Sequence, residues 1–157
     1  MFYQKEILKM ANNYQKIGLV ATDLLKSMIN ENQPSRAEVS DIYNAVLDRC
    51  DGLVLCDETT IGKNPVLITS YLEKILEEAE TNFPYKENLD NTFKLGRQDI
   101  TSTIAYSVVD SGLLLNANCI LANTMSGYTA RKISYFRPIF IEFRNIFKDL
   151  FYFKIKT

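Results

Sequence analysis

Three blocks of sequence decide the fold of this chain: VATDLLKSMI (Val20–Ile29), PSRAEVSDIYNAVLD (Pro34–Asp48) and DGLVLCDETTIGKNP (Asp51–Pro65). Residues 19–21 are an apolar run that overlaps the start of the first block. Residues 52–56 are a second apolar run, near the start of the third block. Runs that are apolar throughout, rather than alternating with polar residues, are typical of parallel strands covered on both faces. Both runs are therefore predicted to be short parallel strands.

Helix signals follow each predicted strand. Ser35 and Glu38 have the spacing of a capping box, so a helix should begin near Arg36. Pro65 suits the first turn of another helix, which should continue to about Glu80. The first of these helices should bury Val39, Ile42, Val46 and Leu47. Since residues 2–15 also have helical spacing, the N-terminal half is predicted to be a helix followed by two βα units.

Beyond residue 80 the composition changes. Residues 81–97 are polar and rich in turn-forming residues, which indicates a linker or a domain boundary. A third unit follows, with helix-like residues 100–115 and 126–136 and strand-like residues 119–122 and 139–143. The last residues, 145–157, are rich in Phe, Lys and Ile without a clean period.

Composition excludes several classes of protein. The formal net charge of −1 and the scattered basic residues argue against a nucleic-acid-binding protein. Three cysteines without a CxxC motif argue against a disulfide framework and favour the cytoplasm. Charged residues interrupt the N-terminal segment, so neither a signal peptide nor a membrane span is expected there. The absence of histidine removes His-based catalytic triads and the commonest zinc sites.

The three blocks resemble pyruvate kinase. That family carries Ala-Thr-Gln-Met-Leu-Glu-Ser-Met, then Pro-Thr-Arg-Ala-Glu-Val-Ser-Asp, then Leu-Ser-Gly-Glu-Thr followed by Gly and Pro, in this order. Upstream, YQKEILKMAN (Tyr3–Asn12) is similar to the family's helix before the first block. Downstream, residues 97–124 and SGYTARKISYFRP (Ser126–Pro138) look like the start of the family's C-terminal domain. The resemblance covers about nine tenths of the chain.

The resemblance implies an α/β fold of a specific kind. Residues 1–80 would be the last two βα units of a TIM-type barrel, residues 81–97 a linker, and residues 98–157 part of a three-layer α/β C-terminal domain with a divergent tail. The family's catalytic lysine and both acidic metal ligands lie upstream of these blocks. We therefore expect the chain to be incomplete and inactive alone.

The first candidate site residue is Thr22. From the residues alone, it is a β-branched residue that ends a strand and caps the next helix. It also falls at the carboxyl end of a predicted strand, the edge at which barrel enzymes bind their substrates. By the resemblance, Thr22 borders the phosphoenolpyruvate site, so it is a candidate for both catalysis and substrate binding.

Cys56 and Glu58 follow the second predicted strand at the same edge. Taken alone, Asp57 and Glu58 are two neighbouring acids in a solvated loop, and Cys56 has no histidine to activate it as a nucleophile. By the resemblance, Glu58 helps to organise the active site and Cys56 replaces a serine near the substrate. Both are therefore candidate catalytic residues.

Thr124, Ser126, Gly127 and Thr129 form a predicted strand-to-helix turn. Two roles are open for such a turn. Its hydroxyl groups can simply cap the next helix, or its hydroxyl and amide groups can bind a phosphate. By the resemblance, this loop holds a phosphate of the sugar bisphosphate activator. Met125 and Tyr128 replace the family's Lys and Arg, which leaves the loop itself without a cation.

The resemblance implies transfer of the phosphoryl group of phosphoenolpyruvate to ADP, giving pyruvate and ATP. Mg²⁺ and K⁺ would be the cofactors, although no metal ligand is assigned within this chain, and the assembly would be a homotetramer. A non-catalytic fragment or pseudoenzyme that serves as an interaction module is the alternative. No nucleic acid or membrane partner is expected.

Overall fold

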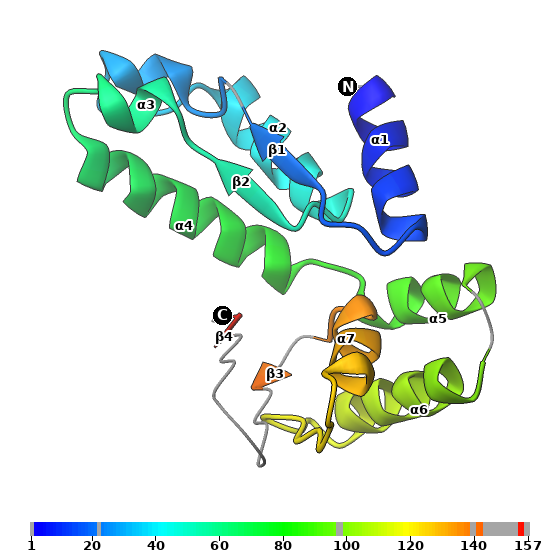
Figure 1. The fold of residues 1–157 in the computed structure, drawn as a ribbon. Helices are drawn as coiled ribbons and strands as arrows, with labels where there is room; N and C mark the ends of the chain where they lie inside the picture. Colours follow the sequence, from blue (N-terminus) through cyan, green and yellow to red (C-terminus); the bar gives the residue numbers. More distant parts are fainter. Residues whose placement is uncertain (1, 22, 97–98, 139–140, 143–153, 156–157) are drawn as a thin grey trace. The chain divides into compact units, whose positions relative to one another are not determined.

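The computed structural model describes residues 2–21, 23–96, 99–138, 141–142 and 154–155 (Figure 1). The chain forms two compact units, Met1–Phe83 and Pro84–Thr157, and each is described by itself.

The first unit is built on two parallel strands. Strand β1 (Leu19–Ala21) pairs with β2 (Gly52–Val54), with Leu19 opposite Gly52 and Ala21 opposite Val54. The chain between them forms the 3₁₀ helix η1 (Lys26–Ile29) and the helix α2 (Arg36–Leu47). Parallel strands require such a crossover, because a tight turn cannot return the chain in the same direction.

Local sequence signals set the helix boundaries. Before the strands, α1 spans Phe2–Asn13. Helix α2 begins after Ser35, where both halves of the predicted capping box are present. After the short α3 (Asp57–Thr60), α4 (Pro65–Thr81) begins with Pro65 in its first turn, and the Asn64 side chain accepts a hydrogen bond from Leu67 N. The strands, helices and caps predicted for this half are thus confirmed, although β2 ends two residues early.

The core of the first unit lies between the sheet and helices α2 and α4, which pack against each other. Its buried side chains are Leu24, Leu25, Met28, Ile42, Ile68 and Ile75. Each fully buried side chain of this kind stabilises the fold by ~1.5–3 kcal/mol. Of the four residues predicted to be buried in α2, Ile42 is fully buried and Leu47 is exposed.

The second unit is mainly helical, with α5 (Tyr85–Leu95), α6 (Ile100–Leu114) and α7 (Tyr128–Tyr135). Its core joins these helices through Leu89, Ala105, Val109, Ile133 and Phe136. Phe93 and Tyr106 stack with ring centroids 4.4 Å apart at the contact between α5 and α6. The two helices are also tied by Lys86, which forms ion pairs with Asp90 and Asp110.

The local structure of the second half differs from the prediction in two places, although the division between the two units, after Phe83, falls inside the predicted segment 81–97. Residues 85–95, within the predicted linker, form α5, because Leu89 and Phe93 have helical spacing and pack on α6. Residues 119–122 are not a strand, since they have no hydrogen-bonded partner strand among the described residues. Their burial does alternate, with Ile120 and Ala122 buried.

Near the end of the chain, β3 (Ile141–Glu142) pairs antiparallel with β4 (Lys154–Ile155). The strand predicted over residues 139–143 is thus present in part, and residues 139, 140 and 143 lie outside the described residues. Among the residues that the structure describes, no helix has the length and apolar character needed to cross a bilayer.

Candidate functional site

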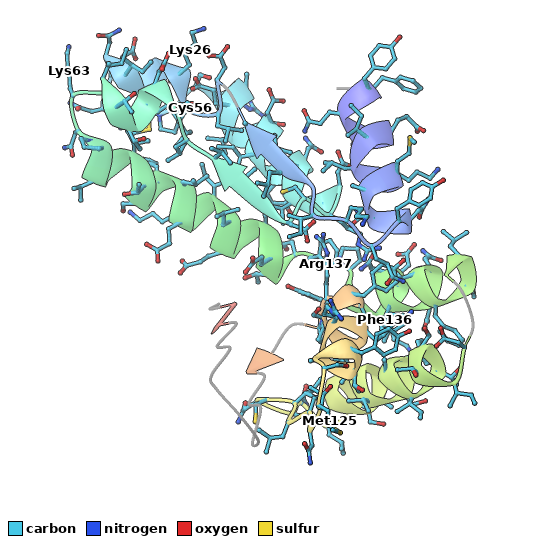
Figure 2. The ribbon with its side chains drawn as sticks, viewed as in Figure 1. Lys26, Cys56, Lys63, Met125, Phe136 and Arg137 are labelled. Carbon is cyan, nitrogen blue, oxygen red and sulfur yellow. The ribbon has the colours of Figure 1, made fainter. Side chains whose placement is uncertain are left out.

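The candidate site lies where β1 and β2 end. Figure 2 shows Lys26, Cys56 and Lys63 at this end of the first unit, in the segments that follow the two strands. Helix α3 contacts η1 there, so the loop after β1 and the loop after β2 meet. Thr22, the first predicted site residue, lies outside the described residues.

Glu58 joins the two loops. Its side chain is 1% exposed, and its two carboxylate oxygens accept hydrogen bonds from backbone N–H groups on different loops. Oε1 accepts from Leu25 N at 3.2 Å, and Oε2 accepts from Cys56 N at 2.8 Å. A buried carboxylate is tolerated only when such donors replace its hydration. Glu58 therefore fixes the position of the loop after β1 relative to the loop after β2.

The pKa of Glu58 shows which effect dominates. Burial is the largest single influence and raises the pKa. Hydrogen bonds from the backbone N–H groups of residues 24, 25, 56 and 58 lower the pKa. Together they outweigh the effect of burial, so the pKa of Glu58 lies below the ordinary value of 4.5. Glu58 is thus a buried carboxylate that stays ionised near neutral pH. A group of this kind can position loops, but it is a poor proton donor.

A second carboxylate fixes the far end of the same loop. Glu38 of α2 accepts hydrogen bonds from Ser27 N at 2.7 Å and from Ser27 Oγ at 2.5 Å. It also completes the capping box by accepting from Ser35 N at 2.8 Å. Desolvation is the largest single influence on the pKa of Glu38 and raises it. The hydrogen bonds from Ser27 and Ser35 together outweigh desolvation, so the pKa lies below the ordinary value of 4.5. Two ionised carboxylates therefore hold residues 25 and 27.

Cys56 and the residues after it are arranged mainly by backbone contacts. Cys56 is half-buried, and its Sγ lies 3.8 Å from Val54 O, which is a weak contact. The hydroxyl groups of Thr59 and Thr60 both donate to Cys56 O at 3.1 Å. Asp57 is exposed. The thiol is thus near the surface at the strand end, where it is free of strong hydrogen bonds.

Exposed charges surround the edge. Asp23 has a left-handed backbone with φ of 53° and forms an ion pair with Lys26 at 3.0 Å. Lys63 Nζ donates to Asn30 O at 3.2 Å, and Lys63 N donates to Ile29 O. Because Lys26 balances Asp23, the carboxylate of Asp23 does not give this edge an uncompensated negative charge.

The lowered pKa values predict how stability depends on pH. Glu38 and Glu58 favour the folded state while ionised, so their contribution is complete above the unfolded pKa near 4.5. It should be lost as the pH falls through the lower, folded values. We expect the free energy of unfolding, measured in urea between pH 7 and pH 3, to fall more steeply for the wild type than for the Glu38→Gln, Glu58→Gln double variant. Equal slopes would contradict this assignment.

The predicted phosphate loop precedes α7. Gly127 has φ of 74° and is the N-cap residue, which is why α7 begins at Tyr128 rather than at Ser126. Gly127 N donates to Thr124 Oγ1 at 3.1 Å, and Tyr128 N donates to Ser126 Oγ at 3.4 Å. The hydroxyl groups of Thr124 and Ser126 thus cap the loop's own amides.

The nearest buried cation does not serve this loop. Lys132 is 7% exposed, and its Nζ donates to Ser102 Oγ at 3.2 Å. It also lies 3.6 Å from Asp99 Oδ2, at the start of α6. The Lys132 ammonium is thus engaged by side chains at the start of α6.

We expect weak phosphate binding at this loop. A phosphate dianion is held best by charge-assisted bonds of ~1.5–3 kcal/mol each, and Met125 and Tyr128 supply none. Fructose 1,6-bisphosphate should bind no more tightly than millimolar in isothermal titration. A micromolar dissociation constant that is lost in the Ser126→Ala, Thr129→Ala variant would show that the loop works without cations.

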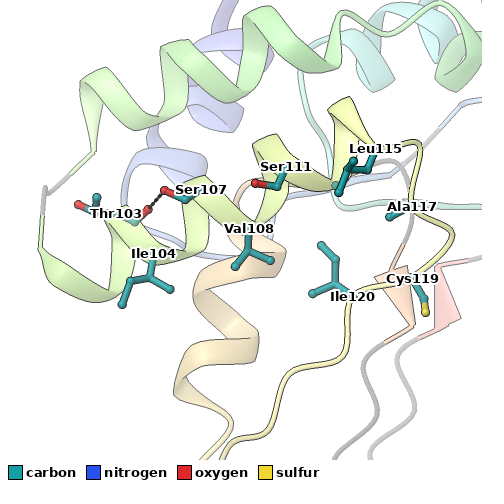
Figure 3. Close-up of a pocket in the computed structure, with 10 residues that line it drawn as sticks. Thr103, Ile104, Ser107, Val108, Ser111, Leu115, Ala117, Cys119 and Ile120 are labelled. Carbon is teal, nitrogen blue, oxygen red and sulfur yellow. Dashed lines mark hydrogen bonds between the residues drawn. The ribbon is translucent and has the colours of Figure 1, made fainter.

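The second unit also has a shallow hollow of about 500 Å³ beside α6 (Figure 3). Its lining includes Ile104, Val108, Leu115, Cys119 and Ile120, and Ser107 Oγ is occupied in a bond to Thr103 O. No charged side chain lines it. The hollow therefore offers no cationic side chain to a phosphorylated substrate.

The described residues do not fit a metal ion. Over the described ranges, no three His, Cys, Asp or Glu side chains come together as a ligand set. Neither Glu38 nor Glu58 is available, because the oxygens of both accept hydrogen bonds from the protein. No step of a reaction is therefore assigned to a metal held by these residues.

Sequence reasoning missed Ser27, Glu38 as a loop anchor, and Gly62. A β-carbon on Gly62 would overlap the backbone carbonyl of Glu58, so this position admits only glycine. The available signal in the sequence was a glycine shortly after Asp-Glu-Thr-Thr, the segment that contains Glu58. The bond from Ser27 to Glu38 had no comparable signal, since it joins a 3₁₀ turn to the next helix.

The first unit is thus an α/β fold with a small parallel sheet, and its candidate site lies at the carboxyl ends of the two strands. Comparison with known proteins identifies the family. The family described as pyruvate kinase, barrel domain, matches residues 1–68. The chain belongs to the pyruvate kinase family, as its three sequence blocks predict.

Individual relatives agree over most of the chain. Pyruvate kinase of Thermotoga maritima is 39% identical over 131 residues, which are 83% of this chain and 27% of the relative. That of Methanocaldococcus jannaschii is 39% identical over 134 residues, 85% of this chain and 29% of the relative. A crystal structure of a pyruvate kinase from Cryptosporidium parvum superposes with a TM-score of 0.83 at 34% identity, covering 89% of this chain and 29% of that chain. The chain thus spans less than a third of each of these relatives.

Proposed function

We propose that residues 1–80 are the last two βα units of a pyruvate kinase barrel and that residues 98–157 are part of its C-terminal α/β domain. In this role, the first unit forms one wall of a site that transfers the phosphoryl group of phosphoenolpyruvate to ADP, giving pyruvate and ATP. The observation that carries the proposal is the barrel-domain match over residues 1–68. The two parallel strands of this segment end side by side, where Glu58 joins the loops that follow them.

The residues of this chain would position the substrate rather than perform the phosphoryl transfer. Glu58, through Leu25 N and Cys56 N, holds the two loops at a fixed separation. We propose that Thr22 and Cys56, at the two strand ends, then border phosphoenolpyruvate. A fixed site lowers the barrier because the ordering of the reacting groups is completed before the reaction. Glu58 is accordingly proposed as a positioning residue.

The charge of the moving phosphoryl group would be balanced elsewhere. Mg²⁺ and K⁺, the cofactors implied for this reaction, stabilise that charge when bound. Since the described residues offer no ligand set, we place these ions on polypeptide outside the described part of the chain. The homotetramer rests on the family resemblance alone and stays a prediction. A cytoplasmic location agrees with three free cysteines.

A second candidate is a non-catalytic interaction module. The specific observation in its favour is the exposed apolar surface of α1, on which Phe2, Tyr3 and Ile7 are each more than 60% exposed. A module of this kind would keep the fold without turning over phosphoenolpyruvate.

The proposed function is tested by transplanting residues 1–68 into Thermotoga maritima pyruvate kinase in place of the matching segment. In this chimera, Thr22→Ala should lower kcat by about 100-fold or more if the hydroxyl takes part in proton transfer. Thr59→Ala is the matched control, because the Thr59 hydroxyl bonds only to Cys56 O among the described contacts. Equal kcat values for the two variants would contradict the assignment of Thr22.

A further inference from the structure

The loop after β1 carries an exposed ion pair at the candidate site. Asp23 Oδ1 lies 3.0 Å from Lys26 Nζ, and the two side chains are 67% and 64% exposed. Leu24 and Leu25, which lie between them in the sequence, are buried in the core of the first unit. Because the two leucines anchor this segment, the loop holds both charged side chains at the surface.

The backbone of Asp23 explains why an aspartate suits this position. Strand β1 ends at Ala21, and Asp23 has the left-handed φ of 53°. Asp and Asn enter this region more readily than other residues that carry a side chain. Asp23 is therefore well suited to the turn by which the chain leaves the strand, but it also brings a carboxylate to the strand-end edge, directly after Thr22.

The other charges of the two loops are engaged or acidic. Both oxygens of the buried Glu58 accept backbone hydrogen bonds, and Asp57 is exposed. Lys63 Nζ donates to Asn30 O at 3.2 Å. Lys26 is thus the cation that lies against Asp23. Since an exposed ion pair contributes little to stability, its main effect is expected on the charge of the edge.

The pair departs from the family block that residues 21–28 resemble. When these residues are aligned with Ala-Thr-Gln-Met-Leu-Glu-Ser-Met, Asp23 stands at the Gln and Lys26 at the Glu. The carboxylate thus lies at position 23, next to Thr22, and a cation stands at position 26. The contact at 3.0 Å shows that these two differences belong together, because one charge offsets the other.

We propose that Lys26 determines the affinity of this edge for an anionic, phosphorylated substrate, and that it does so by offsetting Asp23 rather than by binding the substrate itself. Phosphoenolpyruvate carries a phosphate and a carboxylate, so an unpaired carboxylate beside it would weaken its binding by Coulomb repulsion. The inference rests on the proposed function only for the identity of the substrate.

The test measures KM and kcat for phosphoenolpyruvate in the Thermotoga maritima chimera that carries residues 1–68. Lys26→Met leaves Asp23 unpaired, so KM should rise about threefold or more while kcat stays within about twofold. The rise should shrink at high salt, which screens exposed charges. In the Asp23→Asn, Lys26→Met double variant, KM should return to the wild-type value, because Asn keeps the left-handed backbone without the charge.

Lys9→Met is the matched control. Lys9 is an exposed residue of α1, and this helix packs beside Gly18, at the other end of β1. The substitution removes the same charge far along the strand from the edge, so KM should not change. Circular dichroism checks that all variants are folded.

Two results would overturn the inference: an unchanged KM in Lys26→Met, or a double variant with a KM as high as that of Lys26→Met. The second result would show that Lys26 binds the substrate itself. Isothermal titration with phosphoenolpyruvate ranks the same variants by affinity without requiring turnover. The expected ranking in a chimera that binds but does not react would support the role of Lys26 and count against the proposed activity. A chimera that does not bind phosphoenolpyruvate would overturn both.

Discussion

Replacing Gly62 by alanine should unfold the first unit under conditions in which the wild type is folded. The new β-carbon would overlap the carbonyl oxygen of Glu58 and lie 2.9 Å from Ile68 Cδ1. Backbone atoms cannot move aside as a side chain can, so relief requires shifting α3 away from η1. We expect a loss of ~3 kcal/mol or more, which is a large part of the ~5–15 kcal/mol that stabilises a small domain.

Gly52→Ala is the matched control. Its β-carbon would meet only the flexible end of Leu19, at 3.1 Å from Cδ2, so the loss should not exceed ~1 kcal/mol. Urea unfolding followed by circular dichroism measures both variants. Similar midpoints for Gly62→Ala and Gly52→Ala would show that the loop between α3 and α4 is not packed as described.

The second large effect concerns activity. The purified 157-residue polypeptide alone should show no pyruvate kinase turnover. Positioning and the stabilisation of phosphoryl charge supply nearly all of the catalysis in this type of reaction. Among the described residues, the first unit has two strands and no set of ligands for Mg²⁺. We therefore do not expect the described residues alone to lower the barrier to phosphoryl transfer.

A coupled assay with lactate dehydrogenase measures this directly, with material from an empty-vector preparation as the control. Pyruvate formation that depends on Mg²⁺ and clearly exceeds this control would contradict the expectation. It would mean that the chain assembles a complete site by itself, for example in an oligomer.

Signals that act between near neighbours in the sequence predicted the fold well. Ser35 and Glu38 are three residues apart, and the helix begins where their capping box places it. Pro65 likewise marks the first turn of α4. The apolar residues 19–21 form β1 over the predicted range. Each of these features is decided within a few residues, so one sequence contains the needed information.

Features that depend on tertiary contacts were not predictable in this way. Turn-forming residues suggested a linker, but Leu89 packs into the core of the second unit and a helix forms around it. Residues 119–122 have the composition of a strand but no partner strand among the described residues. At the site, Glu58 could be named as a candidate, but its bond to Leu25 N spans 33 residues. Its positioning role is visible only in the folded chain.

We propose that this chain supplies part of a phosphoenolpyruvate site. The most direct measurement is the turnover of phosphoenolpyruvate and ADP by the Thermotoga maritima chimera that carries residues 1–68. We expect clear Mg²⁺-dependent formation of pyruvate, and we expect Glu58→Gln to lower it at least tenfold because it disturbs the two backbone bonds that join the loops. A folded chimera with no more turnover than the parent enzyme lacking this segment would contradict the account.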